Sequence, residues 1–202
     1  MLLAIVFFVA CTPPDDLLGG GEEPDLPTYS VGDFYQKGGV EGVVFQTHSG
    51  GAHGKLLSLD ETHAVWCDDL HAHVATEATN RNNGWSNANI IRDNFDLSGF
   101  PAVGWGVAKN DLLVGEQLTF RHWYVPSSNE LRSLLLHYQE LNVVLKAHDL
   151  PTLEGKSYWS STEFEGNKDM AVAFRYEEGD STIHSADSIK TGTHCVRAIR
   201  EF

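Results

Sequence analysis

The strongest structural signal in the sequence is an amphipathic segment that follows Pro126. Ser127-Ser-Asn-Glu130 has capping-box spacing, in which the side chains of the first and fourth residues each accept a hydrogen bond from the other's backbone amide. This pattern predicts a helix whose apolar stripe packs against the core. The stripe residues recur at helical spacing and are Leu131, Leu134, Leu135, Tyr138, Leu141 and Leu145.

Short β-like runs lie on both sides of this predicted helix. The run from Gly42 to Thr47 is followed by the turn residues SGGAHG, and Lys55 to Leu57 can return antiparallel, which predicts a hairpin. Toward the C-terminus, the runs YWSST, MAVAFRY and HCVRAIREF are separated by clusters of Gly, Asp and Ser. A chain of 202 residues can bury one sizeable core. We therefore expect one α+β domain, residues 29–202.

A second segment with capping-box spacing is Ser58-Leu-Asp-Glu61. It predicts a first helix that begins there and carries Ala64, Trp66 and Cys67. The Asn-rich stretch that follows, ATNRNNGWSNANIIRDN, has no clear hydrophobic period. We therefore expect it to be largely loop, with a short helical turn around residues 87–92.

The first ten residues, MLLAIVFFVA, are apolar and end at Cys11. The run is too short to span a bilayer, and its length fits the apolar region of a secretory signal, although the usual basic residues are missing. FVAC resembles the end of bacterial lipoprotein signals, in which a small residue precedes the cysteine that is lipidated. We therefore expect a lipoprotein signal in residues 1–11, lipidation of Cys11 and an acidic Pro/Gly tether in residues 12–28. The alternative is an ordinary secretory signal that contains a cysteine.

These segments indicate a protein of a bacterial cell envelope, anchored by lipid, and we expect it in the outer membrane, facing the exterior. The formal net charge of −14 disfavours nucleic acid and anionic membrane surfaces as partners. The expected partners are an extracellular protein or glycan ligand and the membrane that holds the anchor. Part of the negative charge lies in the tether, where it is typical of a solvated spacer, at Asp15, Asp16, Glu22, Glu23 and Asp25.

Histidines and glycines crowd the stretch GVVFQTHSGGAHGKLLSLDETHAVW. A phosphate loop needs Ser or Thr directly after Gly-Lys, but here the next residue is Leu56. A zinc site needs three or four converging ligands. His48 and His53 flank the turn and can meet, but His71 and His73 are two apart, which points them to different sides of a helix, and no His-Glu-x-x-His or Cys-x-x-Cys motif supports either pair. The later glutamates have no sequence context that marks a general acid or base. We therefore predict no metal site, no cofactor and no catalytic residue.

Several spaced segments of the sequence together resemble one bacterial family. They are GDFY with GVVF and GAHG, NNGWSNANI, FPAVGW, WYVPSSNEL, YWSSTE and CVRAIREF, in the family's order from Gly32 to Phe202. The family is named after the C-terminal domain of a collagen-like surface protein. Its fold is C-type-lectin-like, in the branch shared with formylglycine-generating enzymes and the variable proteins of diversity-generating retroelements. The resemblance therefore implies a C-type-lectin-like fold with two helices packed on small antiparallel sheets.

Departures from the enzyme and lectin motifs of this fold bear on function. Sugar-binding C-type lectins hold calcium with a Glu-Pro-Asn or Gln-Pro-Asp loop and a Trp-Asn-Asp strand, but this chain has Trp-Ser-Ser from Trp159 and no such loop. Formylglycine-generating enzymes use a pair of active-site cysteines, whereas Cys67 is expected on the first helix. We therefore expect a non-enzymatic cell-surface adhesion module that binds protein or glycan without calcium. The alternatives are an enzyme of that branch or a hydrolase, and a subunit of a surface appendage.

The resemblance also implies a disulfide and a ligand face. In the lectin-like fold the first helix packs beside the last strand, which implies a bridge between Cys67 and Cys195; the alternative is two buried thiols. In retroelement variable proteins, outward-facing residues between the WSS strand and the last strand carry the variation. The corresponding ligand face here is Glu163, Phe164, Glu165, Asn167, Arg175, Tyr176, His184, Asp187 and His194. The alternative is that these residues form ordinary solvated turns and strand edges.

Overall fold

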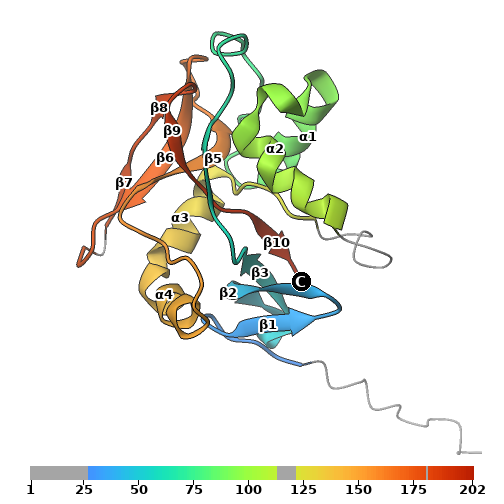
Figure 1. The fold of residues 1–202 in the computed structure, drawn as a ribbon, viewed down its shortest axis with the longest axis vertical. Coiled ribbons are helices and arrows are strands. Elements are labelled where there is room, and N and C mark those ends of the chain that lie inside the picture. The colour runs from blue at the N-terminus through green and yellow to red at the C-terminus, as the bar shows by residue number, and fades with distance from the viewer. Residues whose placement is uncertain (1–26, 113–121, 181) are drawn as a thin grey trace, which may run out of the picture.

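The computed structural model describes residues 27–112, 122–180 and 182–202 (Figure 1). The predicted signal, Cys11 and most of the predicted tether therefore lie outside the described residues. Across the described ranges the chain is α+β, with two β-sheets and the helices α1 to α4, which confirms the α+β class predicted from the sequence. None of the described helices combines the length and the apolar character needed to cross a membrane.

The first sheet joins the two ends of the domain. Its strands run in the order β1 (Phe34–Lys37), β2 (Val40–His48), β3 (His53–Leu57) and β10 (Ile199–Glu201), and all neighbours are antiparallel. β2 and β3 are the predicted hairpin, closed by the turn Ser49–Gly51, in which all three residues have positive φ. Glycine adopts such angles at little cost. The turn therefore explains the glycines of the histidine-rich stretch.

The second sheet holds the segment predicted to carry the ligand face. Its order is β4-β9-β5-β6-β7, and β8 also pairs with β6. β5 and β9 are parallel, and the other neighbours are antiparallel. β5 and β6 are the predicted strands YWSST and MAVAFRY. The strands are β4 (Thr62–Val65), β5 (Ser157–Glu163), β6 (Met170–Tyr176), β7 (Ile183–Ser185), β8 (Ser188–Ile189) and β9 (Thr193–Val196).

Four α-helices in the described ranges cover these sheets (Figure 1). α1 (Gly84–Asn94) and α2 (Pro101–Ala108) pack against β5 and β4, whereas α3 (Ser128–Leu136) packs on β5 and β6 and α4 (Tyr138–Ala147) on β2. The predicted capping box is present at the start of α3. The predicted long helix is interrupted at His137, so its apolar stripe divides between α3 and α4. All six stripe residues are buried.

The predicted helix from Ser58 is wrong, because this segment leads into β4 instead. Ser58 Oγ donates to the carbonyl of Asp60 at 3.0 Å and accepts from the amide of Ala198 at 3.1 Å, so it caps no helix. Glu61, the fourth residue of the motif, pairs with Arg197. Long-range partners have therefore taken both polar groups that the capping box would use.

The Asn-rich stretch predicted to be mostly loop contains the eleven-residue helix α1. Asn83 caps this helix by accepting a hydrogen bond from the amide of Ser86. Asn80 and Asn87 exchange two bonds, from the Asn80 amide to Asn87 Oδ1 at 2.9 Å and from Asn87 Nδ2 to the Asn80 carbonyl at 2.7 Å. The asparagines thus fix the helix and the loop before it, and the described fold has four α-helices rather than two.

The predicted disulfide is also wrong, because Cys67 and Cys195 are both free and buried. In the antiparallel pairing of β4 with β9, Cys195 lies opposite His63. Cys67 is four residues further along the chain, on the order of 13 Å in an extended strand. Bridged cysteines have Cα atoms less than about 7 Å apart. Cys67 follows a strand instead of lying on a helix beside β9, so the implied geometry does not arise.

The core is divided at β5. Tyr158 packs in one apolar cluster with the α3 and α4 stripe, whereas the next residue, Trp159, packs in a second cluster with Trp66, Ile91 and Phe100. Successive residues of a strand point to opposite faces of the sheet, which is why neighbours enter different clusters. β5 is therefore covered on both faces, and only its ends remain to carry surface features.

Candidate ligand-binding site

A small hollow lies beside the C-terminal end of β5, where the loop before α1 meets the turn after β5. Its volume is about 210 Å³. It is lined by Thr79, Arg81, Thr162, Glu163, Phe164, Glu165 and Val172. Glu163, Phe164 and Glu165 belong to the predicted ligand face, and sequence reasoning missed the other four. We call these seven residues the β5 pocket.

Glu163 forms the buried floor of the β5 pocket. Its Oε2 atom accepts hydrogen bonds from the backbone amide and the hydroxyl of Thr76, both at 2.8 Å, and pairs with Lys190 Nζ at 2.6 Å. Lys190 is fully buried, donates also to the carbonyl of Val74 at 2.9 Å, and lies 4.9 Å from the centre of the Trp66 ring. Three contacts therefore engage Oε2 of the carboxylate, with a lysine as counter-ion, and they hold the loop against β5.

Backbone and hydroxyl contacts fasten the loop at the pocket rim. The Glu163 amide donates to the carbonyl of Ala78 at 2.8 Å, and Thr162 Oγ1 donates to the carbonyl of Asn80 at 3.1 Å. The amide of Ser128, at the start of α3, in turn donates to Thr162 Oγ1 at 3.0 Å. Three separate elements thus meet at Thr162, which ties the loop before α1 to β5 and to the start of α3.

The groups free to bind a ligand stand on this rim. Arg81 and Glu165 are exposed, and Phe164 is half-buried between the loop and the turn. Within the described residues the Arg81 guanidinium has no hydrogen-bond or ion-pair partner. The pocket therefore offers a cation, a carboxylate and an aromatic ring around a closed polar floor.

Four other residues of the predicted ligand face do not line the β5 pocket. Asn167 is exposed in the turn after β5, whereas Arg175 pairs across the sheet with Ser157, at the opposite end of β5 from Glu163. Tyr176 is buried, stacks on Tyr138 with ring centres 3.8 Å apart, and donates to the carbonyl of Leu153 at 2.6 Å. His184 is partly buried and pairs with Asp180 at 2.9 Å. The structure therefore separates Arg175, Tyr176 and His184 from the β5 pocket along the length of β6, whereas Asn167 lies beside the pocket, where its amide donates to the carbonyl of Phe164 at 3.2 Å.

The last two predicted residues have partners within the second sheet. Asp187 accepts from the amide of Ala173 at 3.2 Å and from the hydroxyl of Ser185 at 2.7 Å. His194 packs edge-on against Trp159, with ring centres 4.3 Å apart, and burial lowers the pKa of its imidazole. Both side chains are half-buried and stabilise the sheet.

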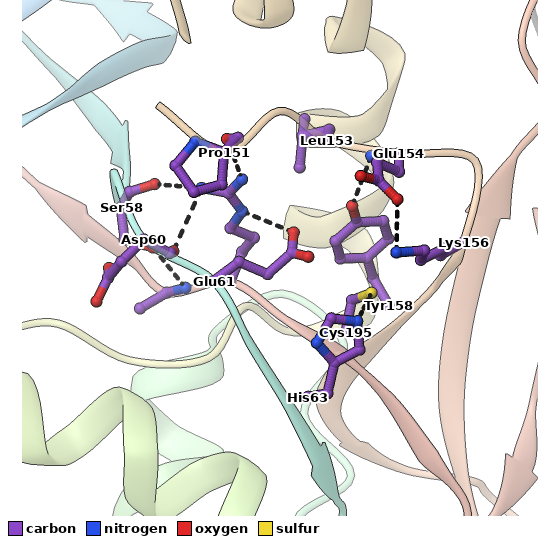
Figure 2. A network of polar contacts seen from close by, with 12 residues as sticks. Ser58, Asp60, Glu61, His63, Pro151, Leu153, Glu154, Lys156, Tyr158 and Cys195 are labelled. Atoms are coloured by element: carbon purple, nitrogen blue, oxygen red, sulfur yellow. Dashed lines mark hydrogen bonds and ion pairs between the residues drawn. The ribbon is translucent and has the colours of Figure 1, made fainter. Parts of the chain in front are cut away.

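A second polar cluster lies at the other end of β5 (Figure 2). Cys195 Sγ is 3.2 Å from His63 Nε2, and burial, together with the carboxylate of Glu61, raises the pKa of the Cys195 thiol to about 12. Glu61 is held by Arg197 Nε at 3.0 Å. A nucleophilic cysteine needs a lowered pKa. The thiol therefore keeps its proton, and the pair lacks the activation required for covalent catalysis.

The comparisons with known proteins concern the fold. No family model and no curated protein matches the chain. Among solved structures, the fold is similar to a fimbrial protein from Bacteroides ovatus, with a TM-score of 0.56 and 22% sequence identity. The match covers 77% of this chain and 37% of that chain, so this chain spans little more than a third of that protein.

Proposed function

We propose that the chain is a bacterial surface lipoprotein whose C-type-lectin-like domain is a non-enzymatic adhesion module. The likeness of its fold to a fimbrial protein supports a surface or adhesion role. FVAC at Cys11 and the acidic stretch after it support a lipid anchor with a flexible tether. The ligand is an extracellular protein or glycan, bound at the β5 pocket.

The observation that carries this proposal is the pairing of a rigid pocket floor with an unpaired cation on the rim. Pockets that enclose a drug-sized ligand have about 300–1,000 Å³. The β5 pocket, at about 210 Å³, is smaller and suits one sugar ring or one side chain of a larger ligand. Arg81 would bind an acidic or hydroxyl group, and Phe164 would contact an apolar face. Because Lys190 neutralises Glu163, the floor needs no calcium ion.

The same contacts support a binding role over a catalytic one. The buried carboxylate of the β5 pocket, Glu163, accepts three hydrogen bonds on one oxygen and has a lysine beside it. A general acid or base must be free to exchange its proton with substrate. Glu163 is committed to the fold through this oxygen instead.

A second candidate is a subunit of a surface appendage, which the likeness to a fimbrial protein also fits. The two candidates differ in where the protein is found. Shearing of appendages from intact cells should leave a lipid-anchored adhesin with the cells, whereas a subunit should be released with the sheared filaments.

The test of the binding site is a glycan and protein array probed with the full chain in detergent. We expect at least one ligand whose binding falls about 5- to 30-fold in Arg81→Ala or Phe164→Ala, as for a side chain at the centre of an interface. Arg175→Ala is the matched control, since it removes an exposed arginine at the far end of the sheet. Equal losses in all three variants, or losses in Arg175→Ala alone, would place the binding site elsewhere.

Anchoring is tested separately by metabolic labelling with a fatty-acid analogue. The wild-type chain should take up the label and Cys11→Ala should not. Labelling that persists in Cys11→Ala would overturn the lipoprotein part of the proposal and leave the binding site unaffected.

A further inference from the structure

Three side chains of different chemistry converge at the N-terminal end of β5. Glu61 and His63 are two residues apart on an extended segment, and such residues lie on the same face. The pairing of β4 with β9 then places Cys195 directly opposite His63. One carboxylate oxygen, one imidazole nitrogen and the thiol sulfur all lie within 4.8 Å of one another. Figure 2 shows the cluster between β4 and the segment before β5.

These separations are close to those around a tetrahedral zinc ion. With a zinc–sulfur distance of about 2.3 Å and a zinc–nitrogen distance of about 2.0 Å, sulfur and nitrogen ligands lie roughly 3.5 Å apart. Cys195 Sγ and His63 Nε2 are 3.2 Å apart. The carboxylate oxygen lies within 4.8 Å of both, so a side-chain rotation that brings it closer would complete the ligand set.

The surrounding residues hold the three groups in this arrangement. Arg197 is fully buried and donates from Nε to Glu61 Oε2 at 3.0 Å, which leaves the other carboxylate oxygen available. The Arg197 guanidinium is itself fixed by the carbonyls of Ser58, at 3.0 Å, and Pro151. Residues that orient metal ligands in this way commonly determine affinity. The ligand geometry is therefore built into the fold without an ion.

We infer that Glu61, His63 and Cys195 bind one zinc ion. Thiolate, imidazole and carboxylate together favour zinc over calcium or magnesium, which prefer oxygen ligands alone. His63 is exposed, so an ion can enter from solvent and a fourth coordination position remains open. On binding, the S–H bond of Cys195 breaks, its proton leaves to solvent, and the thiolate pair bonds to zinc; no redox step occurs. This site is distinct from the β5 pocket and does not depend on the proposed adhesion role.

The test is a cobalt(II) titration of the reduced full chain, since cobalt occupies zinc sites and reports thiolate ligation by a charge-transfer band in the near ultraviolet. We expect a one-to-one endpoint and loss of the band when zinc is added. Cys195→Ser should abolish the band, whereas Cys67→Ser and Cys11→Ser should retain it. His63→Ala should weaken cobalt binding at least about 10-fold, and His73→Ala, which removes an exposed histidine outside the cluster, should not.

The inference is overturned if the wild-type chain shows no thiolate band, or if Cys195→Ser retains it. It is equally overturned if His63→Ala binds cobalt as tightly as the wild type. Because His63 is exposed, this variant should fold normally, so the test does not depend on the buried Cys195 substitution. Circular dichroism of each variant checks that the fold is retained.

Discussion

The two ends of β5 carry polar clusters of opposite kinds. At the C-terminal end, Glu163 and Lys190 are buried together and every bond that the carboxylate oxygen accepts comes from the fold. At the N-terminal end, Cys195 is buried with its proton in place, but its neighbour His63 is exposed. A closed cluster stabilises the fold and positions the surface around it. A cluster that is open to solvent on one side can also bind an ion that enters from solvent.

This difference suggests how to separate structural from functional polar groups in the chain. The buried Glu163 supports the β5 pocket but would not contact the ligand with its engaged oxygen, and the proposed binding groups are the rim residues Arg81, Phe164 and Glu165. At the opposite end, the buried Arg197 has the supporting role, and Glu61, His63 and Cys195 are the proposed zinc ligands. The substitutions below should therefore affect stability at the closed cluster and binding at the open one.

The largest stability effect is expected from Lys190→Met. This change leaves the Glu163 carboxylate buried without its counter-ion, and breaking a buried pair in this way costs about 3–5 kcal/mol. Urea denaturation at pH 7 measures the loss in the free energy of unfolding. Lys156→Met is the control, because Lys156 pairs with Glu154 on the surface near the other end of β5, and its loss should have no measurable effect. Similar losses in both variants would contradict the distinction between the clusters.

A smaller effect is expected from Thr76→Val, which removes the hydroxyl that donates to Glu163 at 2.8 Å. A hydrogen bond to a charged group contributes about 1.5–3 kcal/mol. Thr79→Val is the matched control, since Thr79 is exposed on the rim of the pocket and should change stability little. If Thr76→Val is as stable as the wild type by urea denaturation, the hydrogen bond from Thr76 does not stabilise the buried Glu163 carboxylate, which would contradict this account.

Raising the pH should destabilise the fold through Cys195. Burial and Glu61 raise the pKa of its thiol from 9.0 to about 12, so above pH 9 the unfolded chain releases a proton that the folded chain keeps. The free energy of unfolding therefore falls as the pH rises from 9 toward 12. At pH 10 it is lower by about 1.4 kcal/mol than at neutral pH. Comparison of urea midpoints at pH 8 and pH 10 should show a smaller loss in Cys195→Ser. An identical loss in that variant would contradict the assignment.

The smallest stability effect is expected from His63→Ala in metal-free buffer, because His63 is exposed. Added zinc should increase the difference between the two proteins. The melting temperature of the wild-type chain should rise with the zinc concentration, and that of His63→Ala should rise much less. Equal stabilisation of the two proteins by zinc would indicate that the ion binds elsewhere.

Two capping-box motifs show what the sequence could and could not predict. Ser127 to Glu130 is followed by an apolar stripe at helical spacing, and the helix forms. Ser58 to Glu61 is followed by THAVW, which starts no apolar stripe at helical spacing and contains the β-branched residues Thr62 and Val65, and β4 forms. The motif alone was ambiguous, and the hydrophobic period after it decided the outcome.

Local patterns also located β5 and β6 but could not locate their partners. Arg81 and Phe164 meet at the β5 pocket although more than eighty positions separate them in the chain, and no spacing rule connects them. Glu61 and His63 share one face of an extended segment, but Cys195 reaches them only through the pairing of β4 with β9. Strand pairing of this range depends on the whole core, so both sites required the structure.

The central claim, that the β5 pocket is the ligand-binding face, is tested most directly by hydrogen exchange of the wild-type chain with and without the strongest ligand from the array. The account predicts slower exchange in residues 76–83 and 162–167, where the loop and the turn meet, and no change in residues 175–180. Protection confined to residues 175–180 and 182–187, with the pocket segments unchanged, would contradict it.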